Sequence, residues 1–563
     1  MKRRNPSFWE RNQRTIILAA FIGMVAICVG CIGVAAALMN RPGSPAAVGT
    51  PASDAGELIL ACSPEKAELI KLLTTEFNAA RYKIPDGTRM SIRVEILEPE
   101  EIVAGAVQGR FQAVTPDSST WLDRIDRAWT ESGQSGTLVG QAFRYAVSPV
   151  VIAVWKDVAD ALRYPEQSVG WQDIINRARS DANFRWSHPA TNSASGLLAT
   201  LAMFYAGANK TRSLTVEDVN AQTTLDYVSA VEKTVRYYGE GEVAVIERAL
   251  KEGRSFLDAF VVQEQMVLYF NTRSKDKLIA IYPREGTLWV DHPMALLEGP
   301  GLTSNHRLVF SRWYQYLLST ETQKKIMQLG YRPADLTIPL DGPDSPFTAA
   351  NGVDPRQPQT TLQVPAPAVI DVVRNAWWYT KRHANILLVA DRSGSMRGEK
   401  LSAAKEAFRV FLKQIMGDQE AVGLIEFSSE VTERVPLAPL SKNRAQLEQA
   451  IDALSAGGET ALLDAVDLAY SRLQKLNDKE RINAIVVMTD GKENHSKIKL
   501  AALERRLKDG NKAGVPVIIF CIAYGSDADY QTLQRIAEAT GGQVRQGDLQ
   551  TIQQLYKIIS SYF

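Results

Sequence analysis

Cysteine and histidine are scarce in this chain of 563 residues, which holds four cysteines and five histidines. Outside a long apolar run near the N-terminus only Cys62 and Cys521 remain, in different predicted domains. We therefore expect neither a disulfide framework nor a cysteine metal site. The histidines form no His-Glu-x-x-His motif, which excludes that zinc-protease pattern.

Catalytic motifs are lacking too. The chain has no Gly-x-Ser-x-Gly nucleophile motif and no Gly-x4-Gly-Lys phosphate loop. Residues 63–66 and 402–405 both spell Ser-x-x-Lys, but the Ser-Asp-Asn and Lys-Thr-Gly motifs that accompany it in penicillin-interacting enzymes are absent. We predict that the protein is not an enzyme. The formal net charge of +1 gives no broad basic field, so nucleic acid is not an expected partner.

One long hydrophobic run is present, from Ile16 to Met39. At 1.5 Å per residue it can cross a hydrocarbon core of about 30 Å. Five basic residues precede the run and only Arg41 closely follows it, so the positive-inside rule keeps the short N-terminus in the cytoplasm. We predict a single-pass anchor, with the bulk of the chain outside the cytoplasm.

Two alternatives to this anchor remain open. A cleaved signal peptide is one, although its apolar region should span only about 7 to 15 residues. The other is lipidation of Cys31, which follows Gly30 in a weak likeness of a lipoprotein cleavage site.

The length predicts several domains, each with its own core. The ordinary share of hydrophobic residues, 45%, is typical of globular material. Two stretches rich in proline and small residues divide the chain. The predicted layout is 1–14 cytoplasmic, 15–39 membrane anchor, 40–56 linker, 57–336 first exterior domain, 337–366 Pro-rich linker and 367–563 second exterior domain.

In the second exterior domain, short β-rich runs alternate with amphipathic helical patterns. Strands are predicted at 384–390, 421–427, 484–488 and 515–522, and helices at 400–415, 444–454, 461–475, 497–508, 531–539 and 549–560. This alternation predicts an α/β fold with a doubly wound, mostly parallel sheet, like a Rossmann sheet. Ligand sites in such sheets lie beyond the carboxyl ends of strands.

An acid and two hydroxyls stand at alternating positions just beyond the first of these strands, and two later loops supply another hydroxyl and another acid. The five residues are Asp391, Ser393, Ser395, Thr460 and Asp490. Carboxylate and hydroxyl oxygens in this number suit Mg²⁺, which prefers about six oxygen ligands and keeps several waters. The alternative for the serines is that they cap the following helix.

This set resembles the metal-ion-dependent adhesion site of von Willebrand factor A domains. The resemblance implies Mg²⁺ or Mn²⁺ held by Asp391, Ser393, Ser395 and Thr460, with Asp490 nearby or bound through water. It further implies a protein partner that presents an acidic residue to the metal. Glu459, an acid beside Thr460, is one departure that could make the ion less electrophilic.

The first exterior domain also alternates strand and helix patterns. A strand at 58–62 runs into a helix start with Ser63 at the cap and Pro64 at the first position. Such a start offers free amides to an anion. A further helical pattern spans 310–330.

The segments of this domain resemble a bacterial extracytoplasmic solute-binding protein of the two-lobed, periplasmic-binding type. The resemblance implies two α/β lobes that close on a solute. The hydroxyl-bearing loop positions that it places around the ligand are Ser63, Ser118, Ser119, Ser148, Ser193 and Ser195. Any one of them can instead be a helix cap or a turn residue, and the ligand class (oxyanion, sugar or peptide) stays open.

Two functions follow from this combination. The favoured one is an anchored protein for adhesion or assembly, whose C-terminal domain binds protein carboxylates through the metal, conditioned by a solute in the other domain. The alternative is a tethered receptor of an ABC-type transporter.

The helix predicted from Val369 to Thr380 carries Trp377, Trp378 and Tyr379. Packing of these rings within the second exterior domain is favoured over docking on the first.

Overall fold

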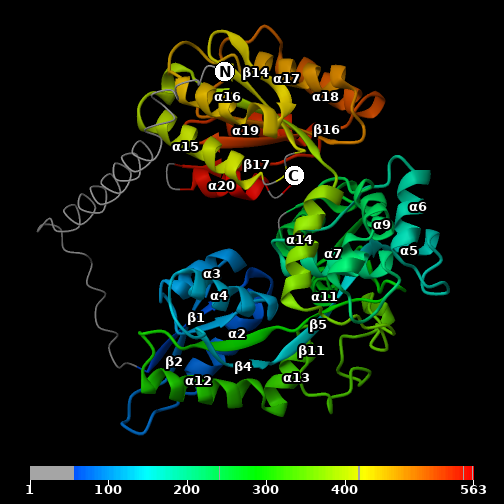
Figure 1. Ribbon diagram of the computed structural model, residues 1–563, viewed down its shortest axis with the longest axis vertical. Coiled ribbons are helices and arrows are strands. Elements are labelled where there is room, and N and C mark those ends of the chain that lie inside the picture. Colours follow the sequence, from blue (N-terminus) through cyan, green and yellow to red (C-terminus); the bar gives the residue numbers. More distant parts are fainter. Residues whose placement is uncertain (1–55, 240, 416, 418, 549–550, 561) are drawn as a thin grey trace, which may run out of the picture. The chain divides into compact units, whose positions relative to one another are not determined.

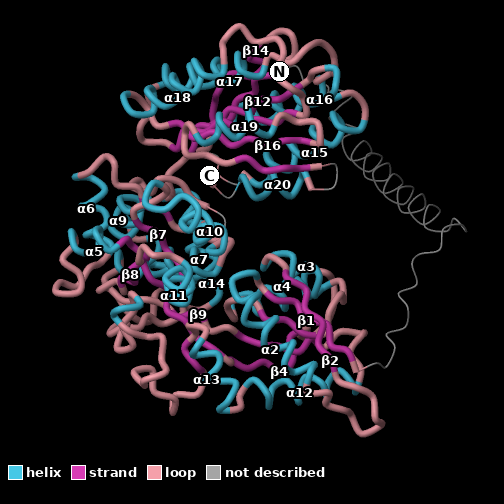
Figure 2. The backbone as a smooth tube through the Cα atoms, turned by 180° about the vertical axis from the view of Figure 1, so that it is seen from behind, coloured by secondary structure: helices cyan, strands magenta, loops and turns pink. Residues whose placement is uncertain are grey.

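The computed structural model describes residues 56–239, 241–415, 417, 419–548, 551–560 and 562–563 (Figure 1). The predicted segments 1–14 and 15–39, and the predicted linker 40–56 except for its last residue, lie outside this range. Within the range, no helix combines the length and the apolar character that crossing a bilayer requires. Residues 56–563 cluster into one unit that contains three sheets (Figure 2).

Lobe 1, which we define by the first sheet, has the strand order β2-β1-β3-β10-β4. β1 pairs in parallel with β2 and β3, whereas β10 runs antiparallel to β3 and β4. Apolar residues are buried in two clusters of this lobe. The elements are β1 (Glu57–Cys62), η1 (Pro64–Lys66), α2 (Ala67–Ala79), β2 (Ser91–Ile96), α3 (Pro99–Val107), β3 (Ala113–Thr115), α4 (Thr120–Glu131), β4 (Val139–Arg144), β10 (Pro293–Leu297), α12 (Ser304–Leu317) and α13 (Thr320–Gln328).

Lobe 2, defined by the second sheet, has the order β11-β5-β7-β6, with β8 and β9 also paired to β5. The chain leaves lobe 1 after β4 and returns at β10, so neither lobe is continuous in sequence. Its elements are β5 (Ala146–Trp155), α5 (Lys156–Ala161), α6 (Trp171–Ser180), β6 (Trp186–Ser187), α7 (Ala194–Gly207), α8 (Val216–Asn220), α9 (Gln222–Glu232), α10 (Glu242–Glu252), η2 (Gly253–Ser255), β7 (Ala259–Gln263), α11 (Glu264–Arg273), β8 (Leu278–Ile281), β9 (Trp289–Val290) and β11 (Arg332–Pro333).

The segment 337–366, expected to be a linker, connects the two regions but has extensive contacts with lobe 2. It contains one short helical turn, η3 (Ala349–Asn351). The amide of Ala280 donates to the carbonyl of Gly352 at 2.7 Å, and Phe347 and Leu362 are buried. A side chain at Gly352, whose φ is +79°, would meet the carbonyl oxygen of Leu278 at 2.1 Å. Glycine at this position therefore allows the segment to lie directly against β8.

The C-terminal domain has one six-stranded sheet of order β14-β13-β12-β15-β16-β17, parallel except for β14. One apolar cluster lies under α15, α16 and α20, and another under α17, α18 and α19, so helices cover both faces. The elements are β12 (Ala384–Asp391), η4 (Gly394–Met396), α15 (Glu399–Gln414), β13 (Ala421–Phe427), β14 (Val431–Pro439), α16 (Leu440–Ala453), α17 (Leu462–Leu476), β15 (Ile482–Thr489), α18 (Leu500–Ala513), β16 (Val517–Tyr524), α19 (Tyr530–Glu538), β17 (Val544–Gly547) and α20 (Ile552–Ser560). The predicted α/β class and mostly parallel sheet are confirmed.

Helix α14 (Pro367–Thr380) forms where a helix was predicted, but the favoured packing of its aromatic residues is wrong for Trp377. That side chain is 1% exposed, and its Nε1 donates to Glu232 Oε1 of α9 at 3.0 Å. Its ring centroid lies 5.1 Å from that of Tyr238. The ring of Trp378 lies 5.1 Å from that of Trp377, and it would lie 3.7 Å from a Cβ at Gly417 in the C-terminal domain. The docking alternative is therefore confirmed for Trp377, and α14 joins lobe 2 to the C-terminal domain.

Candidate functional site

The predicted metal ligands lie at one edge of the C-terminal sheet. Asp391 ends β12, and Asp490 follows the last residue of β15, the parallel neighbour of β12. Because the carboxyl ends of parallel strands meet at the same edge, the two acids approach one another. The loops are joined by backbone hydrogen bonds, in which Gly394 donates to Gly458 at 2.9 Å and Gly457 donates to Arg392 at 2.8 Å.

Hydrogen bonds connect four of the five predicted ligands to one another, and a further bond joins Asp391 to Thr489. Ser395 Oγ donates to Asp490 Oδ1 at 2.7 Å and lies 3.0 Å from Ser393 Oγ. The amide of Ser393 donates to Asp391 Oδ1 at 2.7 Å, and the hydroxyl of Thr489 donates to Asp391 Oδ2. Asp391 and Ser393 are buried, whereas Ser395 is exposed, so the group opens to solvent on the Ser395 side.

Thr460 is the fifth predicted ligand, and its hydroxyl lies near the backbone of Gly491, as does that of Ser395. A Cβ at Gly491 would lie 3.0 Å from Thr460 Oγ1 and 3.5 Å from Ser395 Oγ. The two hydroxyls therefore face the space that a side chain at position 491 would fill. The amide of Thr460 donates to Asn494 Oδ1 at 2.8 Å, which fixes its loop. Glu459, the departure noted above, is exposed.

This oxygen set fits a hard divalent cation. Neighbouring ligands of an octahedral Mg²⁺ with bonds of about 2.1 Å lie about 3.0 Å apart, which matches the separation between Ser393 Oγ and Ser395 Oγ, 3.0 Å. Burial and the charge of Asp490 raise the pKa of Asp391, although hydrogen bonds from Thr489 and Ser393 oppose the rise. A cation beside the two carboxylates would offset this cost of burial. Within the described residues, no group of three or more His, Cys, Asp or Glu side chains could hold a metal, so the hydroxyls are essential to this interpretation.

Lys400 was not predicted as part of the site, yet its ammonium pairs with Asp490 Oδ2. It stands on the second residue of α15 and is half-buried. A positive charge here reduces the negative potential that a cation would meet. Thr489, which donates to Asp391, was also missed, because nothing in its strand pattern distinguishes it from a buried strand residue.

Replacing Lys400 with methionine should therefore strengthen Mg²⁺ binding by about tenfold, or about 1.4 kcal/mol, since a repelling charge near the ion is removed. Calorimetric titration of residues 56–563 measures the effect, with Lys413→Met at the exposed end of the same helix as the matched control. A weaker affinity in the Lys400 variant would mean instead that this lysine holds Asp490 in place.

The six serines predicted for the solute domain divide between the two lobes. Ser63, Ser118 and Ser119 belong to lobe 1, and Ser148, Ser193 and Ser195 to lobe 2. The expected cap at Ser63 does not form, because its hydroxyl donates to the Glu65 carboxylate and a 3₁₀ turn follows.

The other five serines have different surroundings. Ser118 Oγ accepts from the Thr120 amide at 3.3 Å, and the Ser119 amide donates to Asp291 Oδ1 at 2.8 Å. Ser148 Oγ accepts from the Gln265 amide at 3.4 Å. Ser193 caps α7, because its Oγ accepts a hydrogen bond from the Gly196 amide at 3.2 Å, as the alternative interpretation proposed. Ser195 is fully buried, and its hydroxyl has no hydrogen-bond partner among the described residues.

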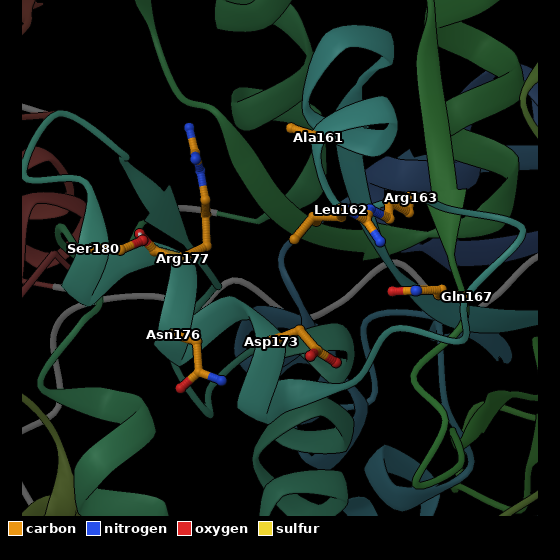
Figure 3. Close-up of a pocket in the computed structure, with 8 residues that line it drawn as sticks. All are labelled: Ala161, Leu162, Arg163, Gln167, Asp173, Asn176, Arg177 and Ser180. Atoms are coloured by element: carbon orange, nitrogen blue, oxygen red, sulfur yellow. Dashed lines mark hydrogen bonds between the residues drawn. The ribbon is translucent and has the colours of Figure 1, made fainter.

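A hollow on the surface of lobe 2 lies between α5 and α6 (Figure 3). None of the predicted site residues lines it. Two of its three charged side chains are engaged within the protein, because Asp173 Oδ2 pairs with Arg284 at 2.8 Å and Arg177 pairs with Asp181 at 2.8 Å. We therefore assign no function to this hollow.

Two family profiles match the chain. The family described as "von Willebrand factor type A domain" matches residues 385–557, and the family described as "Bacterial extracellular solute-binding protein" matches residues 58–332. The extracellular character of the second family indicates an extracytoplasmic location.

Among curated proteins, the chain is 28% identical over 169 residues to inter-alpha-trypsin inhibitor heavy chain H4 of Sus scrofa, covering 29% of this chain and 18% of that protein. It is 26% identical over 180 residues to the uncharacterized protein YfbK of Escherichia coli (strain K12), covering 32% and 30%. The matches thus span less than a third of the length of these relatives.

Among solved structures, the periplasmic binding protein AfuA from Actinobacillus pleuropneumoniae matches with a TM-score of 0.40 and 12% identity, covering 57% of this chain and 98% of that one. A von Willebrand factor type A structure from Catenulispora acidiphila matches with a TM-score of 0.29 and 23% identity, covering 32% and 42%. The two family profiles show that the chain combines an extracellular solute-binding domain over residues 58–332 with a C-terminal von Willebrand factor type A domain over residues 385–557.

Proposed function

We propose that this chain is a membrane-anchored, extracytoplasmic binding protein that attaches to a protein partner through a divalent metal in its von Willebrand factor A domain. The observation that carries the proposal is the convergence of Asp391, Ser393, Ser395 and Asp490 at one sheet edge, with Ser395 exposed. No catalytic role is proposed for either domain. The apolar run at 16–39 supports the anchor.

The residues of the site have separate roles in this proposal. Mg²⁺ or Mn²⁺ is held by the serine hydroxyls and by the carboxylates of Asp391 and Asp490. Lys400 partly neutralises the charge of Asp490. Bound metal supplies a positive centre for an acidic side chain of the partner. The partner approaches from the Ser395 side, because Asp391 and Ser393 are shielded from solvent.

The solute-binding domain conditions this attachment through α14. The helix binds lobe 2 through Trp377 and lobe 1 through an ion pair between Asp371 and Arg127 of α4, 2.7 Å long. It continues directly into Lys381, whose Nζ donates to the carbonyl of Phe563 at 2.6 Å and pairs with Glu420. A movement of one lobe relative to the other would therefore be transmitted to the C-terminal domain through this helix.

Capture of envelope proteins on immobilised residues 56–563 tests the proposal. We expect a partner to be retained in Mg²⁺, to be released by a chelator, and to be lost with Ser395→Ala but not with Ser402→Ala, an exposed serine on α15. A partner that is retained equally with and without the chelator, and equally by the wild type and Ser395→Ala, would contradict the proposal. Retention of a permease that depends on solute would favour the alternative, a tethered transport receptor.

A further inference from the structure

A buried cluster of polar side chains joins the two lobes of the solute-binding domain. Lobe 1 contributes Lys66 on η1 and Asp117 after β3, and lobe 2 contributes Glu242 at the start of α10. All three are buried, and η1 lies against α10. The ammonium of Lys66 donates to the carbonyl of Pro116, the residue before Asp117, and the charges of both Lys66 and Glu242 act on the Asp117 carboxyl.

Several members of this cluster have polar atoms without partners. Within the described residues, the buried atoms that lack a hydrogen bond include Asp117 Oδ1, Ser195 Oγ, Gln265 Oε1 and both ring nitrogens of His292. Each of these side chains is at least nine-tenths buried. Native proteins rarely leave so many buried polar atoms unsatisfied in one place, and each such atom needs an explanation. A bound ligand supplies one.

Contacts within the cluster place these residues next to one another within each lobe. The amide of His292 donates to the carbonyl of Asp117 at 3.2 Å, and the charge of Lys66 lowers the pKa of His292 further after burial. On the lobe 2 side, Gln265 Nε2 donates to Gln263 Oε1 at 2.9 Å, and Gln263 Nε2 donates to Glu242 Oε1 at 3.0 Å. Ser195 faces Glu242 and lowers its pKa, although the two do not reach hydrogen-bond geometry.

Acidic side chains outnumber basic ones in the cluster. The cluster contains three acids, Glu65, Asp117 and Glu242, and one cation, Lys66. The ammonium of Lys66 already donates to the carbonyl of Pro116. Free acceptors outnumber free donors in the cluster, because Asp117 Oδ1 and Gln265 Oε1 can only accept, whereas the donors are the Ser195 hydroxyl and one ring nitrogen of His292. An ammonium or guanidinium group supplies donors to these oxygens, whereas an oxyanion would be repelled by the acids once they are ionised.

We propose that the interlobe cluster of Asp117, Glu242, Ser195 and Gln265 binds a small organic cation bearing a primary ammonium or a guanidinium group. The inference rests on the proposed solute-binding role of residues 58–332 and names its ligand class. Asp117 and Glu242 neutralise the cation from opposite lobes, and Gln265 and Ser195 accept its remaining hydrogens. A ligand held from both sides stabilises the contact between the lobes.

Such a ligand must compete with protons. Burial raises the pKa of Glu242 to about 7, and burial together with the charge of Glu65 raises the pKa of Asp117. The free cluster therefore carries protons near neutral pH, and an arriving cation expels them. Affinity should rise with pH between about 6 and 8, whereas an oxyanion would show the opposite dependence. The titratable groups that act on the cluster are Cys62, Glu65, Lys66, Asp117, Tyr145, Glu242, Asp291, His292 and Tyr331.

Calorimetric titration of residues 56–563 with putrescine, agmatine, arginine, sulfate and phosphate tests the inference at pH 6, 7 and 8, in two buffers of different ionisation enthalpy. We expect at least one of the three organic cations to bind with a stoichiometry of one, with release of protons and at least tenfold higher affinity at pH 8 than at pH 6. Sulfate and phosphate should not bind. Binding of either anion with uptake of protons, or no binding by any of the three cations, would overturn the inference.

Two variants locate the binding. Asp117→Asn and Glu242→Gln keep the size of each side chain and should each lower the affinity by tenfold or more. Glu131→Gln, at the exposed end of α4, should leave it unchanged. Equal affinity in the wild type and both cluster variants would refute the assignment. Metal-dependent partner capture tests the other domain, so failure there and failure here are distinguishable.

Discussion

Replacement of Asp391 by alanine should abolish binding of Mg²⁺ and Mn²⁺, with a loss of affinity of at least about a hundredfold. Loss of groups that merely support a ligand already costs about 10- to 100-fold, and Asp391 is the buried carboxylate to which both Thr489 and Ser393 donate. The fold should persist, because the change removes a buried acid without adding bulk. Calorimetric titration of residues 56–563 measures the affinity, and circular dichroism checks the fold.

The metal titration is repeated with a matched control variant and at several pH values. Asp509→Ala removes an exposed acid from α18 and should leave metal affinity unchanged. Because the pKa of Asp391 is raised, protons should begin to weaken metal binding at a higher pH than for an ordinary aspartate, and the affinity should fall as pH falls. Unchanged affinity in Asp391→Ala would remove this carboxylate from the site.

Replacement of Trp377 by alanine should lower the free energy of unfolding by about 3 to 5 kcal/mol, as for other buried tryptophans. The side chain is 1% exposed and donates to Glu232, which also binds Tyr238 and His188. The variant leaves a cavity at the junction and one carboxylate oxygen of Glu232 without this donor. Urea denaturation of residues 56–563 reports the loss.

Two further variants separate packing from general damage to α14. Tyr379 lies on the same helix and is 74% exposed, so Tyr379→Ala should change the stability by less than about 0.5 kcal/mol. Trp377→Phe keeps a ring but loses the hydrogen bond to Glu232, so its loss of unfolding free energy should lie between those of Trp377→Ala and Tyr379→Ala. If Trp377→Ala cost no more than Tyr379→Ala, the docking role of this side chain would be wrong.

The sheet of the C-terminal domain was largely predictable because its central strands are continuous apolar runs. β14 and β17 were missed because both are edge strands with many half-buried and exposed positions, and β14 contains Pro436 and Pro439. Edge strands lack the apolar pattern that two covered faces impose. The residues predicted as metal ligands could be brought together from the sequence because the Asp-x-Ser-x-Ser spacing is short and parallel strands carry Asp490 to the same edge.

The contacts between domains could not be predicted in the same way. The apolar face of α14 shows that the helix is buried but not against what, so the partner of Trp377 was misjudged. The interlobe cluster is assembled from Lys66, Asp117 and Glu242, which lie far apart in sequence and in no recognisable motif. A hydroxyl at a loop position does not distinguish a ligand-binding serine from a helix cap, and Ser193 is such a cap.

The position of a bound metal tests the central claim most directly. Crystals of residues 56–563 grown with Mn²⁺ would give an anomalous signal at the ion. The account predicts one peak among the oxygens of Ser393, Ser395 and Thr460, beside the carboxylates of Asp391 and Asp490. Crystals in which these five side chains are ordered and Mn²⁺ is absent from this place, or bound elsewhere on the domain, would contradict it.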